Sequence, residues 1–427
     1  MGLLILMGIF ATCVVIGLPV AFALGIAAVS AFYFEGLPLI VAFQRIVSGI
    51  NVFSLMAIPF FIFAGELMFH GGIAARLVRF ASSAVGAMRG GLGIVNVFSS
   101  MLFGGISGSA VADISALGSI LIPVMKEKGY DDDYAVNVTV TSSIAGIMIP
   151  PSHNMILFAV ATGGGVSISK LFLSGVVPGV VMCLCLAIVA YVIAVKRGYS
   201  SEVFPGFTAL FLHFISALPG LFTAVIIVGG VLSGIFTVTE SGAFGTIYAF
   251  LVTVLVYRSL TWESFKTAVV SSVRTTSMVM ILIACAAAFA YMLTYFQVPT
   301  KMIEFMNGVS DNPIVILLMI NCMLLILGMI MDMAALILIC TPIFLPVAVA
   351  IGVDPLQFGM ILMMNLGLGL CTPPVGACLF VGCAVGNVPI EKAVKTIWPF
   401  YAAIFIALMM TTFIPAISLT LPNLLDG

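Results

Sequence analysis

The chain has 427 residues, of which 63% are hydrophobic and 7% are charged, and its formal net charge is −1. Soluble proteins carry about 25% charged residues, so the composition excludes a soluble globular fold and predicts an all-α polytopic membrane protein. The lack of a basic excess argues against nucleic acid as a partner. The sequence contains no GxxxxGK[ST], HExxH or GxSxG motif, and no acidic or histidine pair with catalytic spacing. We therefore expect neither ATP hydrolysis nor an intramembrane enzyme.

Apolar runs bounded by charges predict the membrane spans, and we expect the first to be a retained helix rather than a cleaved signal. In chain order they lie near residues 3–34, 51–69, 134–161, 171–195, 207–236, 240–257, 275–297, 356–386 and 397–421. Segments 37–50 and 259–274 mix scattered charges with apolar residues. This pattern favours interfacial amphipathic helices, although a plain connecting role fits equally well.

Two further segments, 92–127 and 313–350, are each interrupted near the middle by Gly, Ser or Asp. The arms on either side have roughly 14–18 residues, which is short for a hydrocarbon core of about 30 Å. We therefore predict two re-entrant helical hairpins, each of which enters and leaves the membrane on the same side.

The basic residues predict the orientation of the chain, because cytoplasmic loops carry an excess of Lys and Arg. Threading the chain through these spans leaves only Arg45, Lys170 and Lys301 on one side. The other side, which we predict to be cytoplasmic, receives Arg76, Arg79, Arg89, Lys126, Lys128, Lys196, Arg197, Arg258, Lys266, Arg274, Lys392 and Lys395. The first hairpin then opens to the cytoplasm and the second to the outside, with a cytoplasmic N-terminus and a periplasmic C-terminus.

An internal repeat appears when the sequence is shifted by 223 residues. Glycine, proline and aspartate then align without a gap: Gly105 with Gly328, Pro123 with Pro346, Asp131 with Asp354, Gly146 with Gly369, and Pro150-Pro151 with Pro373-Pro374. An odd number of spans separates the copies, so they face opposite ways. We predict a first repeat over 1–206, a linking helix over 207–236 and an inverted second repeat over 237–427. Inverted repeats with broken helices are typical of secondary transporters.

Irregular backbone is tolerated at membrane depth only where protein or a water-filled cavity covers it. Both hairpin tips and both double-proline breaks need such cover, and the prolines leave backbone carbonyls free. Free carbonyls beside Ser, Thr or Asn oxygens suit Na⁺, and the helix N-termini that follow the breaks suit an anion. We predict one sodium site from Gly105, Ser107, Ser109, Pro150 and Ser152, and another from Gly328, Asp332, Thr372, Pro373 and Gly376.

The candidate substrate-binding residues are polar side chains at the same tips and breaks. They are Ser107, Asp113, His153, Asn154, Asn365 and Thr372. Asp113 follows the first tip by one turn, so we favour a supporting role that orders the tip. A lone membrane histidine such as His153 is often only a packed hydrogen-bonding group. We find no Arg or Lys fork for a carboxylate, so we expect helix dipoles, hydroxyl and amide groups and bound Na⁺ to meet the anion. A channel is the competing functional class.

Several stretches resemble the large membrane subunit of the tripartite ATP-independent periplasmic (TRAP) transporters. They read AIPFFIFAGELM, FGGISGSAVADISALGSILIPVMKEKGY, GIMIPPSHNMILFAVATGG, LFLSGVVPG and LGLGLCTPPVGACLFVG. The resemblance implies a sodium-driven elevator-type importer of the bacterial inner membrane, with no organic cofactor. It also implies two partners, a small four-helix membrane subunit and a periplasmic substrate-binding protein. The substrate would be a carboxylate, and SGSAVAD followed by PPSHN is most similar to the sialic-acid type. C4-dicarboxylate import and a carrier without a binding protein are the alternatives.

Overall fold

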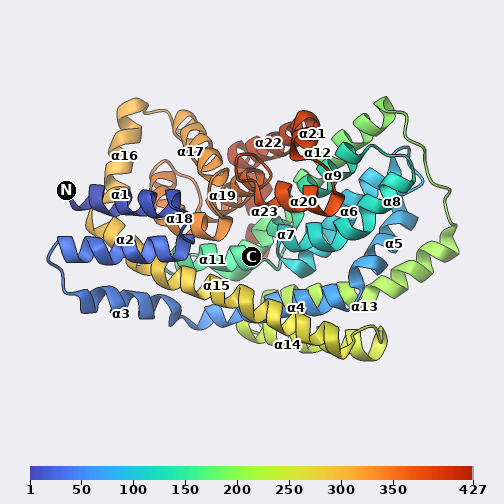
Figure 1. Cartoon of the computed structure of the whole chain (residues 1–427), viewed down its shortest axis with the longest axis horizontal. Coiled ribbons are helices and arrows are strands. Elements are labelled where there is room, and N and C mark those ends of the chain that lie inside the picture. The colour runs from blue at the N-terminus through green and yellow to red at the C-terminus, as the bar shows by residue number, and fades with distance from the viewer. Residues whose placement is uncertain (426–427) are drawn as a thin grey trace.

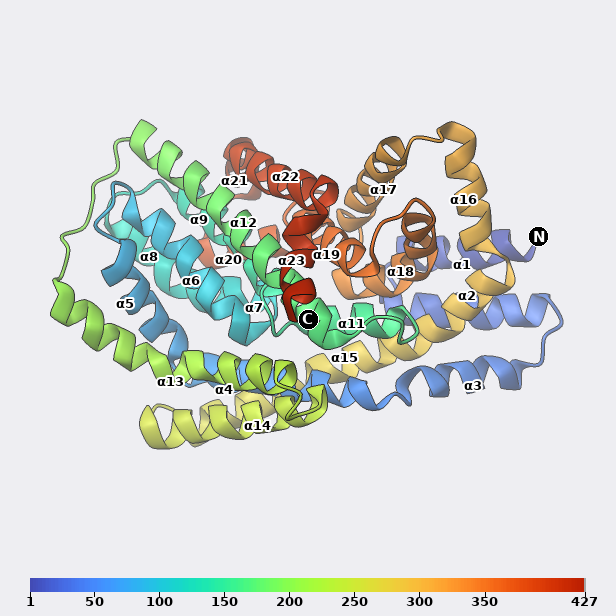
Figure 2. The same cartoon turned by 180° about the vertical axis from the view of Figure 1, so that it is seen from behind.

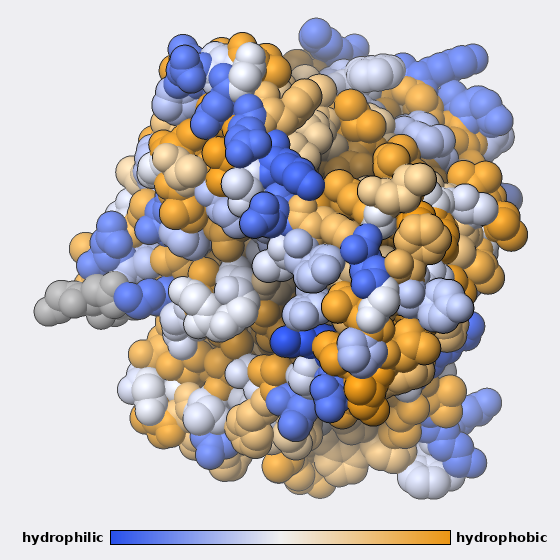
Figure 3. All heavy atoms as spheres, turned by 90° about the vertical axis from the view of Figure 1, so that its left-hand side faces the viewer, coloured by the Kyte–Doolittle hydropathy of each residue, from blue (hydrophilic) through white to orange (hydrophobic). Residues whose placement is uncertain are grey.

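The computed structural model describes residues 1–425, and every regular element in that range is helical (Figure 1). By length and composition, six of these helices could cross a membrane, or up to nine if each bent pair forms one span. Large hydrophobic side chains remain exposed along many of them, and hydrophobic residues cover much of the face in Figure 3. A bilayer is the environment in which such a surface is stable.

One layer, here called the scaffold, lies along one side of the molecule in Figures 1 and 2. Within it α15 packs along α2, α3 and α4, and α14 packs against α4 and α13. The scaffold consists of α1 (Gly2–Val15), α2 (Val20–Phe34), α3 (Leu39–Ile50), a short 3₁₀ turn (Phe53–Met56), α4 (Ala57–His70), α13 (Phe207–Leu232), α14 (Val238–Leu251), a π turn (Val252–Val256) and α15 (Trp262–Tyr295).

The two predicted hairpins lie in opposite halves of the molecule, with α17–α18 on the left of Figure 1 and α6–α8 on the right. The first comprises α6 (Gly91–Ser107), α7 (Ala110–Asp113), a π turn (Ile114–Gly118) and α8 (Ser119–Glu127). The second comprises α17 (Pro313–Gly328) and α18 (Met333–Ala350). Short helices that the sequence analysis did not anticipate, α5 (Ile73–Val85) and α16 (Val298–Val309), lead into them.

Both predicted broken helices are interrupted at their double prolines, and both Pro–Pro bonds are cis. The first runs through α9 (Asp132–Ser142), α10 (Ala145–Met148) and α11 (His153–Ala161), with a bend of 52°. The second runs through α19 (Pro355–Leu370) and α20 (Ala377–Gly386). The remaining elements are α12 (Ile168–Lys196), α21 (Ile390–Thr396), α22 (Trp398–Phe413) and α23 (Pro415–Leu425).

Element bounds recur at the spacing seen in the sequence. A shift of 223 residues places α6 on 314–330, where α17 lies, and places 110–127 on α18. The same shift carries α3 and α4 together onto the single helix α15. The fold is therefore an all-α membrane fold of inverted repeats with two re-entrant hairpins and two broken helices. The outer limits of the copies, at 1–206 and 237–427, stay a prediction.

Two predicted spans and one predicted interfacial segment differ from the prediction. Residues 3–34 form two antiparallel helices rather than one span, because Gly17 with φ +88° and Pro19 end the first helix. Residues 259–274 are not a separate interfacial helix, because Trp262–Tyr295 contains no Gly or Pro and stays helical throughout. Residues 397–421 bend by 61° just before Pro415, which lacks the N–H that a continuing helix needs.

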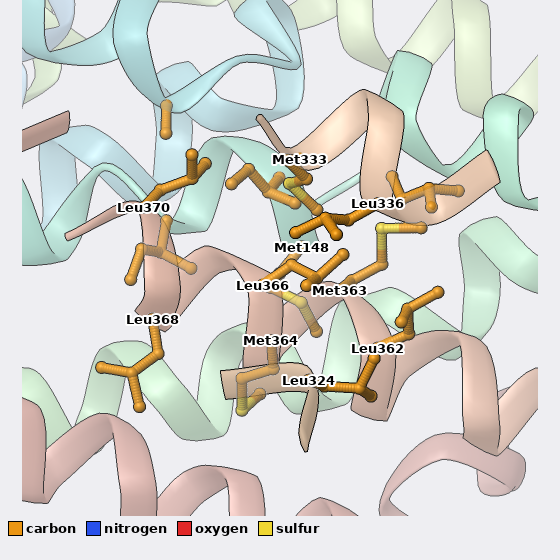
Figure 4. Packing of buried hydrophobic residues seen from close by; sticks show 14 of the residues in the cluster. Met148, Leu324, Met333, Leu336, Leu362, Met363, Met364, Leu366, Leu368 and Leu370 are labelled. Carbon is orange, nitrogen blue, oxygen red and sulfur yellow. The ribbon is translucent and has the colours of Figure 1, made fainter. Parts of the chain in front are cut away.

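Side chains from both repeats share one hydrophobic core between the hairpins and the broken helices. Met148 of α10 lies among Met333 and Leu336 of α18 and Met363 and Leu366 of α19 (Figure 4). All five are buried, with exposed fractions of 3% or less. We call α6–α11 and α17–α20, which contain the two hairpins and the two broken helices, the transport elements.

Candidate functional site

The first hairpin tip lies directly against the first double-proline break. A Cβ placed on Gly104 would come within 2.8 Å of the Gly146 nitrogen, and one on Gly105 within 3.2 Å of the Pro150 oxygen. At Gly108, where φ is +63°, a Cβ would lie 3.1 Å from the Pro151 oxygen. Glycine therefore allows the backbone of the tip to reach the backbone of the break.

Asp113 lies beneath this contact with only 1% of its surface exposed. The Ser107 hydroxyl donates to Asp113 Oδ1, whereas Asp113 Oδ2 has no hydrogen-bond partner among the described residues. The Ser152 hydroxyl, at the break, is fully buried and has no partner either. A buried carboxylate oxygen without a partner is costly. The residues that gather here thus bring together oxygen atoms without a protein partner, and oxygen is the ligand type that a hard cation prefers.

The second tip and the second break meet in the same way. A Cβ on Gly369 would come within 2.6 Å of the Gly328 carbonyl carbon, so the two glycines let the helices touch. The Val375 amide in the break donates to the Met329 carbonyl in the tip at 3.1 Å. Asn365 is fully buried below this contact and donates to Asn321 Oδ1 at 2.8 Å. The Asn365 Oδ1 atom has no partner within residues 1–425, so the second tip–break contact also leaves a buried oxygen without a hydrogen bond.

The second break satisfies part of its own backbone. The Thr372 hydroxyl donates to the Leu368 carbonyl at 2.8 Å, and the Tyr401 hydroxyl donates to the Cys371 carbonyl. Gly376 is buried, and a Cβ there would approach the Thr372 oxygen to 2.9 Å. Pro373 lies half-buried between these residues. The predicted residues Thr372, Pro373 and Gly376 therefore share one loop, to which Tyr401 was not assigned in advance.

A cavity of about 610 Å³, here called the tip cavity, separates the transport elements from the scaffold. On the transport side it is lined by Phe103, Ser107, Ser109, Val111, Ala112, Ser115, His153 and Asp332. On the scaffold side it is lined by Ile62, Gly65, Glu66, Phe69, His70, Thr267, Ser271, Thr275 and Met278. Ser107, at its wall, is also the donor to buried Asp113, so the cavity and the first predicted sodium site share a residue.

Other predicted residues divide between the cavity and the interior. His153 and Asp332 both line the tip cavity, although they come from different repeats. Asp332 is exposed there and caps α18, since its carboxylate accepts from the Ala334 amide at 3.0 Å. Ser109 also lines the cavity and accepts from the Ala112 amide at 3.5 Å as the cap of α7. Asn154 is 5% exposed and does not line the cavity.

The scaffold wall carries polar residues to which the sequence analysis gave no site role. Ser271 donates to Glu66 Oε1 at 2.6 Å, and His70 Nε2 lies 3.5 Å from Glu66 Oε2. Thr267, Ser271 and Thr275 recur every four residues on α15 and so share one helix face. This four-residue spacing of hydroxyl side chains is the sequence signal from which the scaffold wall of the cavity could have been predicted. No Lys or Arg is among the residues that line the cavity.

Re-entrant tips that meet broken helices, beside a polar cavity at the scaffold seam, are typical of a membrane transporter. The family model of the "Tripartite ATP-independent periplasmic transporter, DctM component" matches residues 7–417. The chain belongs to this family.

Relatives in the family match along most of the chain. The "C4-dicarboxylate TRAP transporter large permease protein DctM" of Rhodobacter capsulatus is 35% identical and covers 100% of both chains. The "Sialic acid TRAP transporter large permease protein SiaM" of Vibrio cholerae is 38% identical and covers 90% of both. The "Isethionate TRAP transporter permease protein DctMQ" of Oleidesulfovibrio alaskensis is 39% identical over 97% of this chain and 65% of its own length.

Two solved structures share the fold at low sequence identity. The Neisseria gonorrhoeae MtrF structure has a TM-score of 0.60 at 15% identity and covers 88% of this chain and 83% of its own. The Alcanivorax borkumensis YdaH transporter has a TM-score of 0.59 at 12% identity and covers 90% of both chains.

Proposed function

We propose that this chain is the transport subunit of a sodium-driven, binding-protein-dependent importer of carboxylates. The observation that carries the proposal is the pair of tip–break contacts, each of which leaves a buried side-chain oxygen without a partner: Asp113 Oδ2 in the first and Asn365 Oδ1 in the second. One Na⁺ at each tip–break contact would supply the missing partner of these oxygens. Ser107 donates to Asp113 at the first tip–break contact and also lines the tip cavity, so a cation bound at this contact would order a residue that faces the substrate.

The substrate that we favour is a sugar acid such as sialic acid. The transport side of the tip cavity offers serine hydroxyls, His153 and the Asp332 side chain, but no Lys or Arg. One carboxylate with many hydroxyls suits this lining better than a dianion, which would need more positive charge. Relatives named for sialic acid and for C4-dicarboxylates both match the chain, so C4-dicarboxylate import is the second candidate.

Transport would occur by an elevator motion, in which the transport elements slide along the scaffold. By the predicted orientation, the end of α4 and the start of α15 that line the tip cavity are cytoplasmic, so this conformation faces inward. A small four-helix membrane subunit would support the scaffold, and a periplasmic protein would deliver the substrate. The complex would lie in the bacterial inner membrane.

Uptake by proteoliposomes that contain this chain and the small membrane subunit tests the proposal. With the binding protein outside, an inward Na⁺ gradient should drive accumulation of N-acetylneuraminate above its external concentration, and choline should not replace Na⁺. Succinate under the same conditions tests the second substrate. Accumulation without a Na⁺ gradient would refute the coupling, accumulation without the binding protein would refute that dependence, and flux that only equilibrates the substrate would indicate a channel.

A further inference from the structure

A second cavity, of about 490 Å³, lies on the same seam but beside the other end of α15. We call it the Arg45 cavity. Arg45 and Ser48 of α3, Tyr291 and Thr294 of α15, Thr162 after α11, and Thr341 of α18 contribute its polar lining. It therefore lies between the scaffold and the transport elements, as the tip cavity does. By the predicted orientation, this end of the seam faces the outside.

The Arg45 side chain is held against an aromatic ring but forms no ion pair with a described carboxylate. Its guanidinium carbon lies 4.4 Å from the centre of the Tyr291 ring, and the side chain is exposed. No carboxylate within residues 1–425 forms an ion pair with Arg45. Stacking on an aromatic ring fixes the plane of a guanidinium and leaves its edge of N–H donors free. Such an edge matches a carboxylate.

The opposite wall offers a second unsatisfied group. Thr341 lines the cavity from α18, is fully buried, and has no partner for Oγ1 among the described residues. Buried hydroxyls are normally hydrogen-bonded. An exposed guanidinium without an ion pair on the scaffold and a buried hydroxyl without a partner on a transport element thus line the same cavity, which is large enough for a small organic anion.

The two cavities differ in the charge of the scaffold wall. The tip cavity meets α15 at Thr267, Ser271 and Thr275, where Glu66 supplies a carboxylate, and the Arg45 cavity meets the same helix at Tyr291 and Thr294. At about 1.5 Å per helical residue, Thr275 and Tyr291 are separated by about 24 Å along the helix. An elevator displacement along α15 would carry the transport elements from one wall to the other.

We propose that Arg45, stacked on Tyr291, is an anion-recognition station on the scaffold that receives the substrate carboxylate in the outward-facing conformation. Inward movement exchanges this guanidinium for the Glu66 wall, which has no Lys or Arg, so the anion is held more weakly at the side of release. The inference rests on the proposed function for the direction of movement. The binding of an anion at Arg45 rests on the scaffold wall of this cavity, Arg45 and Tyr291, which the movement leaves in place, whereas Thr341 moves with α18.

Uptake kinetics of Arg45→Ala test the station. The half-saturating concentration of N-acetylneuraminate-loaded binding protein should rise about tenfold or more, while the maximal rate stays within about twofold of wild type. Lys301→Ala is the matched control, because it removes another exposed basic residue predicted to be outside that does not line the cavity. Unchanged half-saturation in Arg45→Ala, or an equal effect of Lys301→Ala, would overturn the proposal.

Equilibrium binding separates this proposal from sodium coupling. Purified protein in phosphatidylcholine nanodiscs is titrated with radiolabelled N-acetylneuraminate and succinate, and Arg45→Ala should weaken binding of at least one probe about tenfold. This result would support the station even if wild-type uptake proves independent of Na⁺. The proposal would be overturned if neither probe bound the wild-type protein, or if the wild-type protein and Arg45→Ala bound both probes equally. So would displacement of the probes by phosphatidylglycerol, because the cavity would then hold a lipid headgroup.

Discussion

Asp332 combines two roles at the edge of the tip cavity. It begins α18 by accepting from the Ala334 amide, and it exposes a charge to the cavity. Its aligned partner in the first repeat, Ser109, also caps a helix and also lines the cavity. The repeat therefore conserves the geometry of a capped helix start at each tip, while one position carries a charge and the other a hydroxyl.

Substitution of Asp332 separates these roles. Asn caps helices about as well as Asp, whereas Ala does not, and loss of a cap costs about 0.5–2 kcal/mol. We predict that Asp332→Ala lowers the free energy of unfolding by about 1 kcal/mol relative to Asp332→Asn, as measured by thermal denaturation in detergent. Both variants should show weakened Na⁺-dependent uptake, because both lack the carboxylate. Equal stability of the two variants would contradict the capping role, and wild-type uptake would contradict the role of the charge.

At the scale of elements, each hairpin is attached to its broken helix through glycine. The contact between Gly328 and Gly369 is closer than any Cβ would permit, and the backbone bond from Val375 to Met329 depends on it. The breaks depend on the tips for a related reason. The chain can turn at each break because proline has no backbone N–H to continue the helix, and the tip then covers the backbone carbonyls that are left free. Tip and break therefore form one structural unit in each half.

Gly369→Ala should disrupt this unit. The added methyl would lie 2.6 Å from the Gly328 carbonyl carbon, so the hairpin must shift. We predict a loss of about 1–3 kcal/mol of stability, which is typical of overpacking, together with a fall in uptake. Gly308→Ala is the control, because nothing lies within 4 Å of its added Cβ, and alanine favours a helix by up to about 1 kcal/mol. Gly369→Ala with stability equal to Gly308→Ala would disprove the contact.

The sequence predicts the hairpins and breaks well, because Gly, Pro and Asp interrupt apolar runs at places where only a covered backbone is stable. It does not predict α5 or α16, because Arg76 and Arg79 in one, and Lys301 and Glu304 in the other, resemble loop charges. It places Asp332 and Ser109 near the tips but does not show that they face a cavity. That depends on how the transport elements pack against α4 and α15, which no local pattern encodes.

At the scale of the whole molecule, the pairing of α1 with α2 changes the expected topology. A single span over 3–34 places the N-terminus opposite Glu35, whereas two antiparallel helices return the chain to the side on which it began. Figures 1 and 2 show α1 and α2 side by side, with the N-terminus at the same end as the turn into α3. Arg45 follows on α3 and is one of the few basic residues predicted to be outside.

We therefore predict a periplasmic N-terminus in place of the cytoplasmic one expected from a single span. An N-terminal epitope tag should be removed by protease added to spheroplasts. A tag in the connection at 198–206, which follows the basic end of α12, should be protected until the membrane is permeabilised. Protection of both tags in intact spheroplasts would instead place the N-terminus in the cytoplasm.

An elevator mechanism requires that the cation and the substrate bind to the same moving body. Asp113, Ser152 and Asn365 are buried among the transport elements, and Ser107 both donates to Asp113 and lines the tip cavity. The scaffold contributes the opposite wall. Sodium would then act by ordering a tip and a break that otherwise leave buried oxygens unpaired.

Thermal stabilisation by sodium tests this central claim most directly. Ligand that binds only the folded state raises stability in proportion to RT ln(1 + [L]/Kd). The melting temperature of the purified wild-type protein should rise on replacement of choline chloride by NaCl at constant ionic strength, and Asp113→Asn should abolish most of the rise. Asp311→Asn, at an exposed position, should keep it. A sodium-dependent rise in Asp113→Asn equal to that of wild type would contradict the account.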